Sequence, residues 1–561
     1  MELEQQLAQL TGLVSSNDSN RNPDDANTLS MHRTINTVEV SAQPSTNKIT
    51  RPRSLADGLK MLSLEATAEK YVGSSSGIAF AKLTQAVLCR LSPDQDAFVF
   101  GDETPQYEQD VLPSLEASLD PNLAFMELDM MLESPQHLML AAEDRCDVEN
   151  PVELSQLGAP HIASLLDFYF AHSHTLYPII QKERLVTALW EAYADPGTAS
   201  GQSPLWLFRI WMVLAIGSTT YCSVTLMDET ESIQLFGKAM TYFEAAMGCG
   251  DLAALEVLML QVSYAFFNSA GPNTWFLVGV AARMAIGMGL HTREVYEPLP
   301  ADIADYQKRL WFSLYMMDRV VSMALGRPFA IQDDDITPFA DADDENITPE
   351  GIRPTANLSP SSMAVPLHIL DLRKIATDIG INNHSVKRGL QDTRSQDQRS
   401  QATQALHRRL IDWRRSMPFP LPDTKSNVPH LCTSWFDLNY YTHLMMLYRP
   451  PAGEQTVYDA ESLEILANSS GMAIQEAGNL YRQQRFAFNW LNLMTVFNSV
   501  LSLMYSTTAQ RGDLAGVLQR TSAIQDLELA VEMLHRFCVK FPSALQIKDM
   551  VQTVLLRFKS A

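Results

Sequence analysis

Apolar residues recur every three or four positions over most of the chain from about residue 150 onward, which is the spacing of helices with one buried face. Alternating runs rich in Val, Ile and Thr are few, whereas long segments rich in Leu, Ala, Met and Gln are many. No repeat of fixed period is visible. The pattern therefore predicts an all-α fold with a large multi-helix body.

The bounds of the predicted helices follow from the residues that interrupt this spacing. The segment 177–180 contains Pro178 and is expected to be extended, because proline disfavours a helical conformation in the residue before it. The predicted helical ranges are 160–169, 183–193, 205–221, 229–247, 252–268, 274–289, 302–325, 363–380, 400–415, 432–448, 459–486, 490–507 and 524–541.

The N-terminal part follows a different pattern. An a/d spacing of four, three and four, typical of a short dimerising coiled coil, is found at Leu3, Leu7, Leu10 and Val14. Residues 15–120 are mostly polar and cannot bury enough apolar surface to order themselves, so they are expected to form a disordered linker. A weakly helical stretch is expected near 59–91 within it.

Four parts are therefore predicted along the chain. They are a coiled-coil segment at 1–14, the linker at 15–120, a helical region at 150–350 and a C-terminal helical part of the same body at 360–561.

The range from Trp275 to Leu290 is apolar nearly all round, which predicts a helix at the centre of the core. Its one charge, Arg283, then needs a partner, because burying an unpaired charge is prohibitive. We expect that partner to be Asp318 on the neighbouring helix. Gly289 suits the left-handed conformation that often ends a helix.

The next helix, 302–325, carries the polar residues expected to lock two core helices together. Tyr315, Asp318 and Arg319 fall at neighbouring positions on a helix surface. The turn that follows uses glycine for permissive backbone angles and proline to fix the exit. The predicted structural network consists of Arg283, Gly289, Arg309, Trp311, Asp318, Arg319, Gly326, Arg327 and Pro328.

Charge and cysteine usage narrow the function. The net charge of −23 repels a phosphate backbone, and the basic residues occur only in scattered pairs, so this chain is not expected to bind DNA directly. The six cysteines form no Cys-x-x-Cys pair, which predicts neither a zinc knuckle nor a redox motif. Residues 210–227 are uncharged, but their Ser and Thr content favours a buried helix over a membrane span.

The sequence contains few residue patterns that are typical of a catalytic or metal site. Seven acids crowd residues 333–345, which invites a magnesium-diphosphate site built on Asp334 and Asp335. Such a site needs carboxylates one turn apart on a helix, and Pro338 breaks the helix there, so a solvated loop is expected. His172 and His174 are two residues apart and point to different sides of a helix, so with His161 they do not form a metal trio. We expect no catalytic, cofactor-binding or metal-binding residue in this chain.

Several short motifs, in order, resemble the middle homology region of the fungal zinc-cluster transcription factor family. The first part of the resemblance is carried by His172-x-His174-x-x-Tyr177-Pro178-Ile179, by Ala282-Arg283-Met284-Ala285 through Gly289-Leu290-His291, by Arg309-Leu310-Trp311, by Asp318-Arg319 and by Gly326-Arg327-Pro328 with its acidic strip. The second part is carried by the segment from Trp413 to Pro418 and by Leu447-Tyr448-Arg449-Pro450-Pro451. Together they cover about 150–455.

The resemblance implies a family architecture of three parts: an N-terminal two-zinc, six-cysteine module that reads DNA as a dimer, a short coiled coil, and the helical region. The stretch ELEQQLAQL resembles the linker that follows the zinc module, so the module itself is expected to be missing. Zinc is therefore expected only with a preceding cysteine module, and DNA contact only through that module or a partner protein.

The sequence thus predicts a nuclear transcription regulator that controls a metabolic or biosynthetic gene set, acts as a homo- or heterodimer and responds to a small-molecule effector. One alternative is a coregulator that lacks its own DNA-binding module and dimerises with a full-length relative. The other is a helical enzyme of the isoprenoid type.

Overall fold

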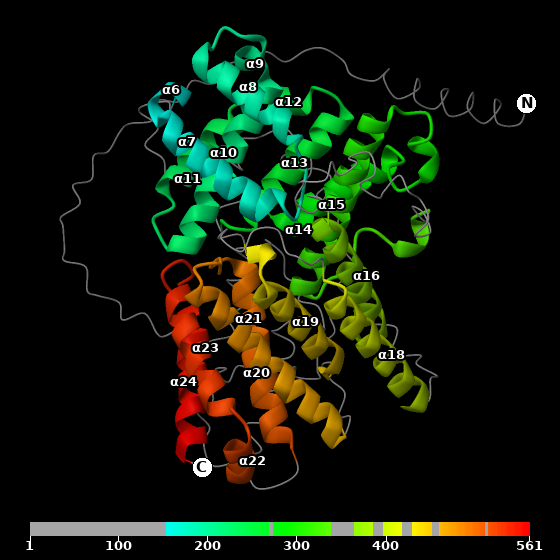
Figure 1. Cartoon of the computed structure of the whole chain (residues 1–561), viewed down its shortest axis with the longest axis vertical. Coiled ribbons are helices and arrows are strands. Elements are labelled where there is room, and N and C mark those ends of the chain that lie inside the picture. Colours follow the sequence, from blue (N-terminus) through cyan, green and yellow to red (C-terminus); the bar gives the residue numbers. More distant parts are fainter. Residues whose placement is uncertain are drawn as a thin grey trace, which may run out of the picture. The chain divides into compact units, whose positions relative to one another are not determined.

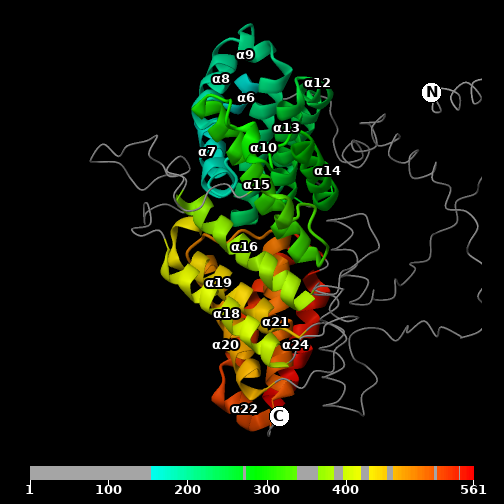
Figure 2. The ribbon, with the colours of Figure 1, turned by 90° about the vertical axis from the view of Figure 1, so that its right-hand side faces the viewer.

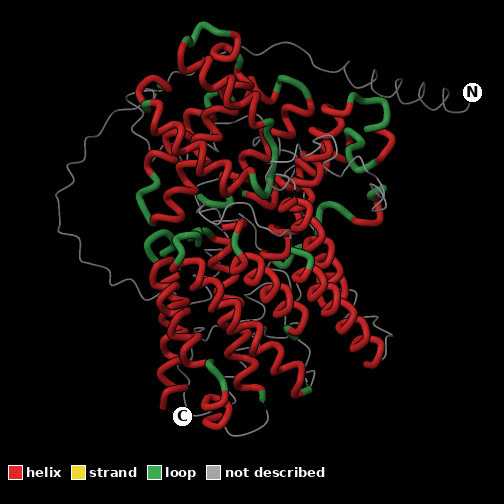
Figure 3. The backbone as a smooth tube through the Cα atoms, in the orientation of Figure 1, coloured by secondary structure: helices red, strands yellow, loops and turns green. Residues whose placement is uncertain are grey.

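A computed structural model of the chain describes residues 153–268, 273–337, 364–384, 396–417, 429–450, 459–510, 514–542 and 544–560. Within these ranges the regular elements are helices and there is no strand, as expected for an all-α fold (Figure 3). The predicted coiled coil at Leu3, Leu7, Leu10 and Val14 and the predicted linker lie outside the described residues.

The first group of elements runs from residue 154 to residue 335. It consists of α6 (Leu154–Leu157), α7 (Ala159–Tyr169), the π-helical turn η1 (Phe170–His174), α8 (Lys182–Ala194), α9 (Ala199–Gln202), α10 (Pro204–Thr225), α11 (Thr230–Met240), α12 (Phe243–Met247), α13 (Asp251–Ala265), α14 (Thr274–Gly287), η2 (Arg293–Val295), α15 (Ala301–Leu325) and η3 (Asp333–Asp335).

The second group runs from residue 364 to residue 560 (Figure 1). It consists of α16 (Ala364–His384), α18 (Gln396–Arg415), η5 (Pro429–Leu431), α19 (Thr433–Tyr448), α20 (Ala460–Arg482), α21 (Trp490–Ala509), α22 (Leu514–Arg520), α23 (Ala523–Phe537) and α24 (Ala544–Ser560).

Helix α10 is the central element of the first group. It is long and apolar enough to cross a membrane, but 78% of its apolar window is buried inside the protein, because α7, α8, α11, α12 and α13 pack around it. Its last turn ends at Leu226, which adopts left-handed backbone angles. The prediction of a buried helix over 210–227 is therefore confirmed.

Helices α19 to α24 pack against one another in the second group, and α16 and α18 lie beside α19 (Figure 2). The sequence prediction missed α24, whose apolar face is buried at Ala544, Ile547, Met550, Val551, Val554, Leu555 and Phe558. It also joined α11 and α12 into one helix, whereas the structure breaks the helix at Thr241 and Tyr242.

Helix α14 does not lie at the centre of the core, and that prediction is wrong. Only one face is buried, at Thr274, Val278, Ala281, Ala282 and Ala285, against α13 and α15. The opposite face is open to solvent, where Phe276 remains 36% exposed. Apolar residues are spread around α14, but only one of its faces is buried, so this distribution was not a sign of burial on all sides.

The two groups are joined by contacts between residues distant in sequence. The ammonium of Lys540, which follows α23, forms an ion pair with Glu229 and donates to the Ser223 hydroxyl of α10 at 2.6 Å. The backbone N–H of Phe488 donates to the Ser223 carbonyl at 2.7 Å. Helix α15 also contacts α16, and η1 contacts η5.

One close crossing in the core needs a glycine. Gly217 of α10 is buried against α7, and a Cβ at this position would overlap the backbone carbonyl of Leu165. The main chains of α10 and α7 meet directly at this point, so a Cβ at residue 217 could be accommodated only by shifting one of the two helices.

We expect Gly217→Ala to lower the free energy of unfolding by about 1–3 kcal/mol or more through overpacking. The matched control is Gly237→Ala in α11, where a Cβ meets nothing within 4 Å and alanine favours the helix. Urea denaturation followed by circular dichroism measures both changes. Equal stability of the two variants would contradict the close crossing.

Candidate functional site

The buried guanidinium of Arg319 is the centre of the polar network on α15. Its side chain is 0% exposed. The guanidinium donates to Asp318 at 2.7 Å, to the Thr377 hydroxyl at 2.8 Å and to the carboxylate of Asp333. The rings of Tyr315 and Phe329 cover its two faces, with centroids 4.0 and 4.3 Å from its central carbon. Stacking between aromatic rings suits the planar, weakly hydrated guanidinium better than it would an ammonium.

The carboxylate of Asp318 fixes the chain that leaves α15. Besides Arg319, it accepts hydrogen bonds from the backbone N–H groups of Ala330 and Ile331 at 3.0 and 3.2 Å and from the Ser322 hydroxyl at 3.2 Å. Burial raises the pKa of Asp318, and these donors together with Arg319 oppose that shift. The network thus holds the segment after the turn against its own helix.

The turn itself is built as the sequence predicts. Gly326 ends α15 in a left-handed conformation with φ of 68°, and the backbone N–H of Arg327 donates to the Ser322 carbonyl at 2.8 Å. Arg327 is buried and lies over the ring of Trp275 on α14, 4.8 Å from the centroid. Pro328 is exposed, and its carbonyl accepts from the Ser322 hydroxyl.

The predicted pair between Arg283 and Asp318 is wrong. Arg283 lies on the exposed face of α14, so its charge needs no buried partner. Asp318 instead pairs with the adjacent Arg319. A buried partner was expected because α14 was predicted to be buried on all sides, whereas only one of its faces is buried.

The remaining residues of the predicted network lie as follows. Gly289 has φ of 77° just after α14, which confirms the predicted left-handed position. Arg309 is half-buried and pairs with Asp305 one turn earlier at 3.2 Å. Trp311 is fully buried beside the ring of His291. The hydrogen bonds and ring contacts of Arg319 involve Asp318, Thr377, Asp333, Tyr315 and Phe329, and neither Arg309 nor Trp311 is among these residues.

The first residue of the acidic strip, Asp333, belongs to the Arg319 network, although a solvated loop was expected here. Asp333 pairs with Arg319, although its own side chain stays 38% exposed. Asp334 and Asp335 complete the short turn η3, and residues 338–345 lie outside the described residues. In the described ranges no group of three or more His, Cys, Asp or Glu side chains could hold a metal ion. The four described cysteines are free and are not grouped as the zinc module implied by the resemblance would require. His161 pairs with Glu231.

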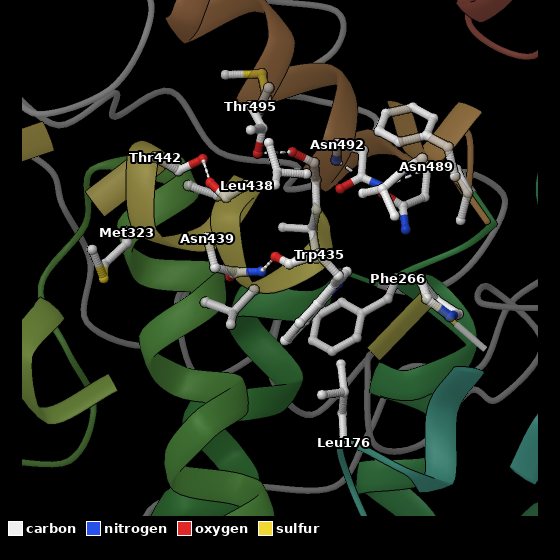
Figure 4. Close-up of a pocket in the computed structure, with 18 of the residues that line it drawn as sticks. Leu176, Phe266, Met323, Trp435, Leu438, Asn439, Thr442, Asn489, Asn492 and Thr495 are labelled. Atoms are coloured by element: carbon white, nitrogen blue, oxygen red, sulfur yellow. Dashed lines mark hydrogen bonds between the residues drawn. The ribbon is translucent and has the colours of Figure 1, made fainter. Parts of the chain in front are cut away.

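A cavity of about 210 Å³, partly open to solvent, lies where the two groups of helices meet (Figure 4). Its wall comes from η1 and the residues after it, the ends of α13 and α15, Arg373 of α16, and parts of η5, α19, α20 and α21. Phe266, Trp435 and Leu176 come together on one side of it (Figure 4). A mostly apolar wall with a few polar side chains is typical of small-molecule sites.

Three histidines in the cavity wall are neutral at physiological pH. Burial lowers the pKa of His172 to about 4 and that of His430 to about 3. Burial, reinforced by the nearby charge of Arg373, lowers the pKa of His443 to about 3. A neutral imidazole offers one donor and one acceptor, so His172 and His430 can orient a ligand without adding charge, whereas both ring nitrogens of His443 already contact Asn439 and Arg373.

Sequence reasoning missed the cavity. Its wall draws on residues from 172 to 498, and nothing in the local spacing of Arg373, Trp435 or Asn492 sets them apart from ordinary helix residues. His172 and Tyr177 were singled out for their motif, but their place in the wall follows only from the tertiary packing.

Comparison with known proteins shows what this chain is similar to. Residues 166–415 match the model of the fungal specific transcription factor domain. The match therefore includes the Arg319 network and the part of the cavity that precedes residue 416. No solved structure matches the chain.

Curated relatives are fungal regulators. The chain is 24% identical to the positive regulator of purine utilization of Emericella nidulans, over 71% of this chain and 43% of that protein. It is 25% identical to protein STB5 of Saccharomyces cerevisiae, over 70% of this chain and 54% of that protein. It is 22% identical to the pyrimidine pathway regulatory protein 1 of the same yeast, over 88% of this chain and 59% of that protein. The chain thus spans about half the length of the curated relatives it matches.

We expect Arg319→Met to lower the free energy of unfolding by about 3–5 kcal/mol, because it leaves the buried Asp318 without its counter-charge. The control is Arg283→Met, which changes an exposed side chain and should stay within about 0.5 kcal/mol of the natural protein. Urea denaturation measures both. A larger loss of unfolding free energy for Arg283→Met than for Arg319→Met would contradict this assignment and would favour an ion pair between Arg283 and Asp318.

Proposed function

We propose that this chain, which carries a fungal specific transcription factor domain over residues 166–415, is a transcription regulator of the fungal zinc-cluster type that controls a metabolic or biosynthetic gene set. The match to this domain is the observation that carries the proposal. Relatives that cover most of this chain are named as regulators of purine utilization and of the pyrimidine pathway, which supports a metabolic target set.

The helical body is proposed to act as the regulatory part and to respond to a small-molecule effector. The cavity between the two groups of helices supports this role, since its wall is mostly apolar with a few polar side chains and combines elements of both groups. A ligand that contacts both groups can change their packing, which is how a bound molecule shifts a conformational equilibrium.

Nuclear location and contact with DNA follow from the same proposal. The net charge of −23 disfavours contact between the helical body and a phosphate backbone. DNA is therefore proposed to be reached through a zinc-cluster module or through a partner protein that carries one. The same charge is the observation that favours the second candidate, a coregulator that pairs with a full-length relative.

The relatives also bear on the enzyme alternative. They are regulators rather than enzymes, and the acids Asp334 and Asp335 lie in a short turn and not one turn apart on a helix. A helical enzyme of the isoprenoid type is therefore not proposed.

We expect the chain to change transcription when it is fused to a heterologous sequence-specific DNA-binding module. A reporter gene with basal activity and matching upstream sites should change its transcript level severalfold, up or down. The control is the same fusion with Arg319→Met, whose body is destabilised, with fusion levels compared by immunoblot. An unchanged reporter in every growth medium, with the natural fusion present in the nucleus, would contradict a regulatory function.

The predicted coiled coil supplies a separate test of dimerisation. We expect the double substitution Leu7→Ser and Leu10→Ser to convert a dimer of the chain into a monomer in sedimentation analysis, because both residues occupy a/d positions. The control is Gln9→Ser, which lies between two a/d positions. A dimer that survives the double substitution would assign the interface to another part of the chain.

A further inference from the structure

The cavity has a charge pattern opposite to that of the whole chain. The chain has 65 acidic and 42 basic residues, yet the described wall of the cavity contains three arginines and no aspartate or glutamate. The arginines are Arg373, Arg449 and Arg485. A wall with cations and without carboxylates favours a negatively charged ligand over a neutral or cationic one.

Arg373 is the cation whose surroundings bear most directly on a ligand. Among the described residues its hydrogen-bonding contact is His443, with Nη1 and Nε2 3.4 Å apart, and its Nε is buried without a partner. Burial lowers the pKa of Arg373, and the influence that opposes this shift is the hydroxyl-bearing ring of Tyr177. No carboxylate of the described residues neutralises it, so this buried charge is a cost to stability.

Neutral groups near this cation have unused hydrogen-bonding capacity. His172 and His430 are each 4% exposed, and the Nδ1 atom of each is buried without a partner in the described residues. Both residues line the same cavity as Arg373. Buried polar groups are normally hydrogen-bonded, so these two ring nitrogens are available to a ligand in this cavity.

The rest of the wall suits an apolar or aromatic body. Phe266 and Trp435 present their rings to the cavity, with Leu176 beside them (Figure 4), and Met323 also lines the cavity. The amide groups of Asn439 and the hydroxyl of Thr442 already donate to backbone carbonyls of their own helix, so they add little specific recognition.

The backbone that carries Arg373 is held by the Arg319 network. The Thr377 hydroxyl accepts from Arg319 and donates to the backbone carbonyl of Arg373 at 3.1 Å. Because α16 is held to α15 at this point, the part of the helix from which Arg373 extends is in place before a ligand arrives. Such preorganisation lowers the cost of binding.

We propose that this cavity binds a small organic anion, with its charged group at Arg373 and its apolar or aromatic body against Phe266 and Trp435. The inference rests on the effector-sensing role proposed above and names the chemical class of the effector: a compound that joins a carboxylate, sulfonate or phosphate group to an apolar body.

The test uses two fluorescent probes that differ in one charged group. They are 8-anilinonaphthalene-1-sulfonate and its neutral counterpart without the sulfonate, N-phenyl-1-naphthylamine. The purified 561-residue chain should bind the sulfonate at least tenfold more tightly than the neutral probe. Arg373→Met should weaken sulfonate binding at least tenfold, the smallest loss expected for a charge-assisted hydrogen bond, and change the affinity for the neutral probe less than threefold.

Two further variants separate charge from shape. Arg373→Lys keeps the positive charge and should stay within about fivefold of the natural protein for the sulfonate. Arg408→Met removes an exposed arginine of the adjacent helix α18 and should leave both affinities unchanged. Without a probe, Arg373→Met should melt at the same or a higher temperature than the natural protein, because it removes a buried charge that lacks a carboxylate partner.

Equal affinity of the natural protein for the two probes would overturn the proposal, as would undiminished sulfonate binding by a folded Arg373→Met variant. If that variant loses its helical circular dichroism signal, the preference of the natural protein for the sulfonate decides the question. The outcome is independent of the reporter experiment: charge-selective binding without a transcriptional effect would contradict the proposed function alone, and a transcriptional effect without charge-selective binding would contradict this inference alone.

Discussion

The burial of the Arg319 guanidinium is the constraint on which the centre of this protein depends. A fully buried cation is tolerable only when its donors are satisfied, and here they reach Asp318, Asp333 and Thr377. Those three residues belong to α15, to the turn η3 and to α16. One side chain therefore joins a core helix, the acidic turn that follows it, and the first helix of the second group.

This arrangement connects the family motif to the cavity. The Thr377 hydroxyl joins Arg319 to the backbone of Arg373, so the Arg319 network holds the helix that carries a cation in the cavity wall. Because the wall combines both groups of helices, an anion bound there would be held by both. A regulator can use such a contact to couple the level of a metabolite to the packing of its body.

Local spacing in the sequence predicted much of the fold and little of the candidate site. The buried face of the helix 400–415 was predicted from Leu406, Leu410 and Trp413, because burial on one face leaves a periodic pattern. Arg283 was misplaced because an apolar helix can still expose one side. The pairing of Asp318 with its neighbour Arg319, and the contact of Arg373 with His443 in the cavity wall, depend on how distant helices pack, which no local pattern encodes.

Arg373, on the helix that the Arg319 network holds to α15, is proposed to bind an anion. A crystal structure of the chain with 8-anilinonaphthalene-1-sulfonate bound decides this. Sulfonate oxygens should lie within hydrogen-bonding distance of the Arg373 guanidinium, with Thr377 still joining Arg319 to α16. A sulfonate bound elsewhere, or an acidic side chain paired with Arg373, would rule this proposal out.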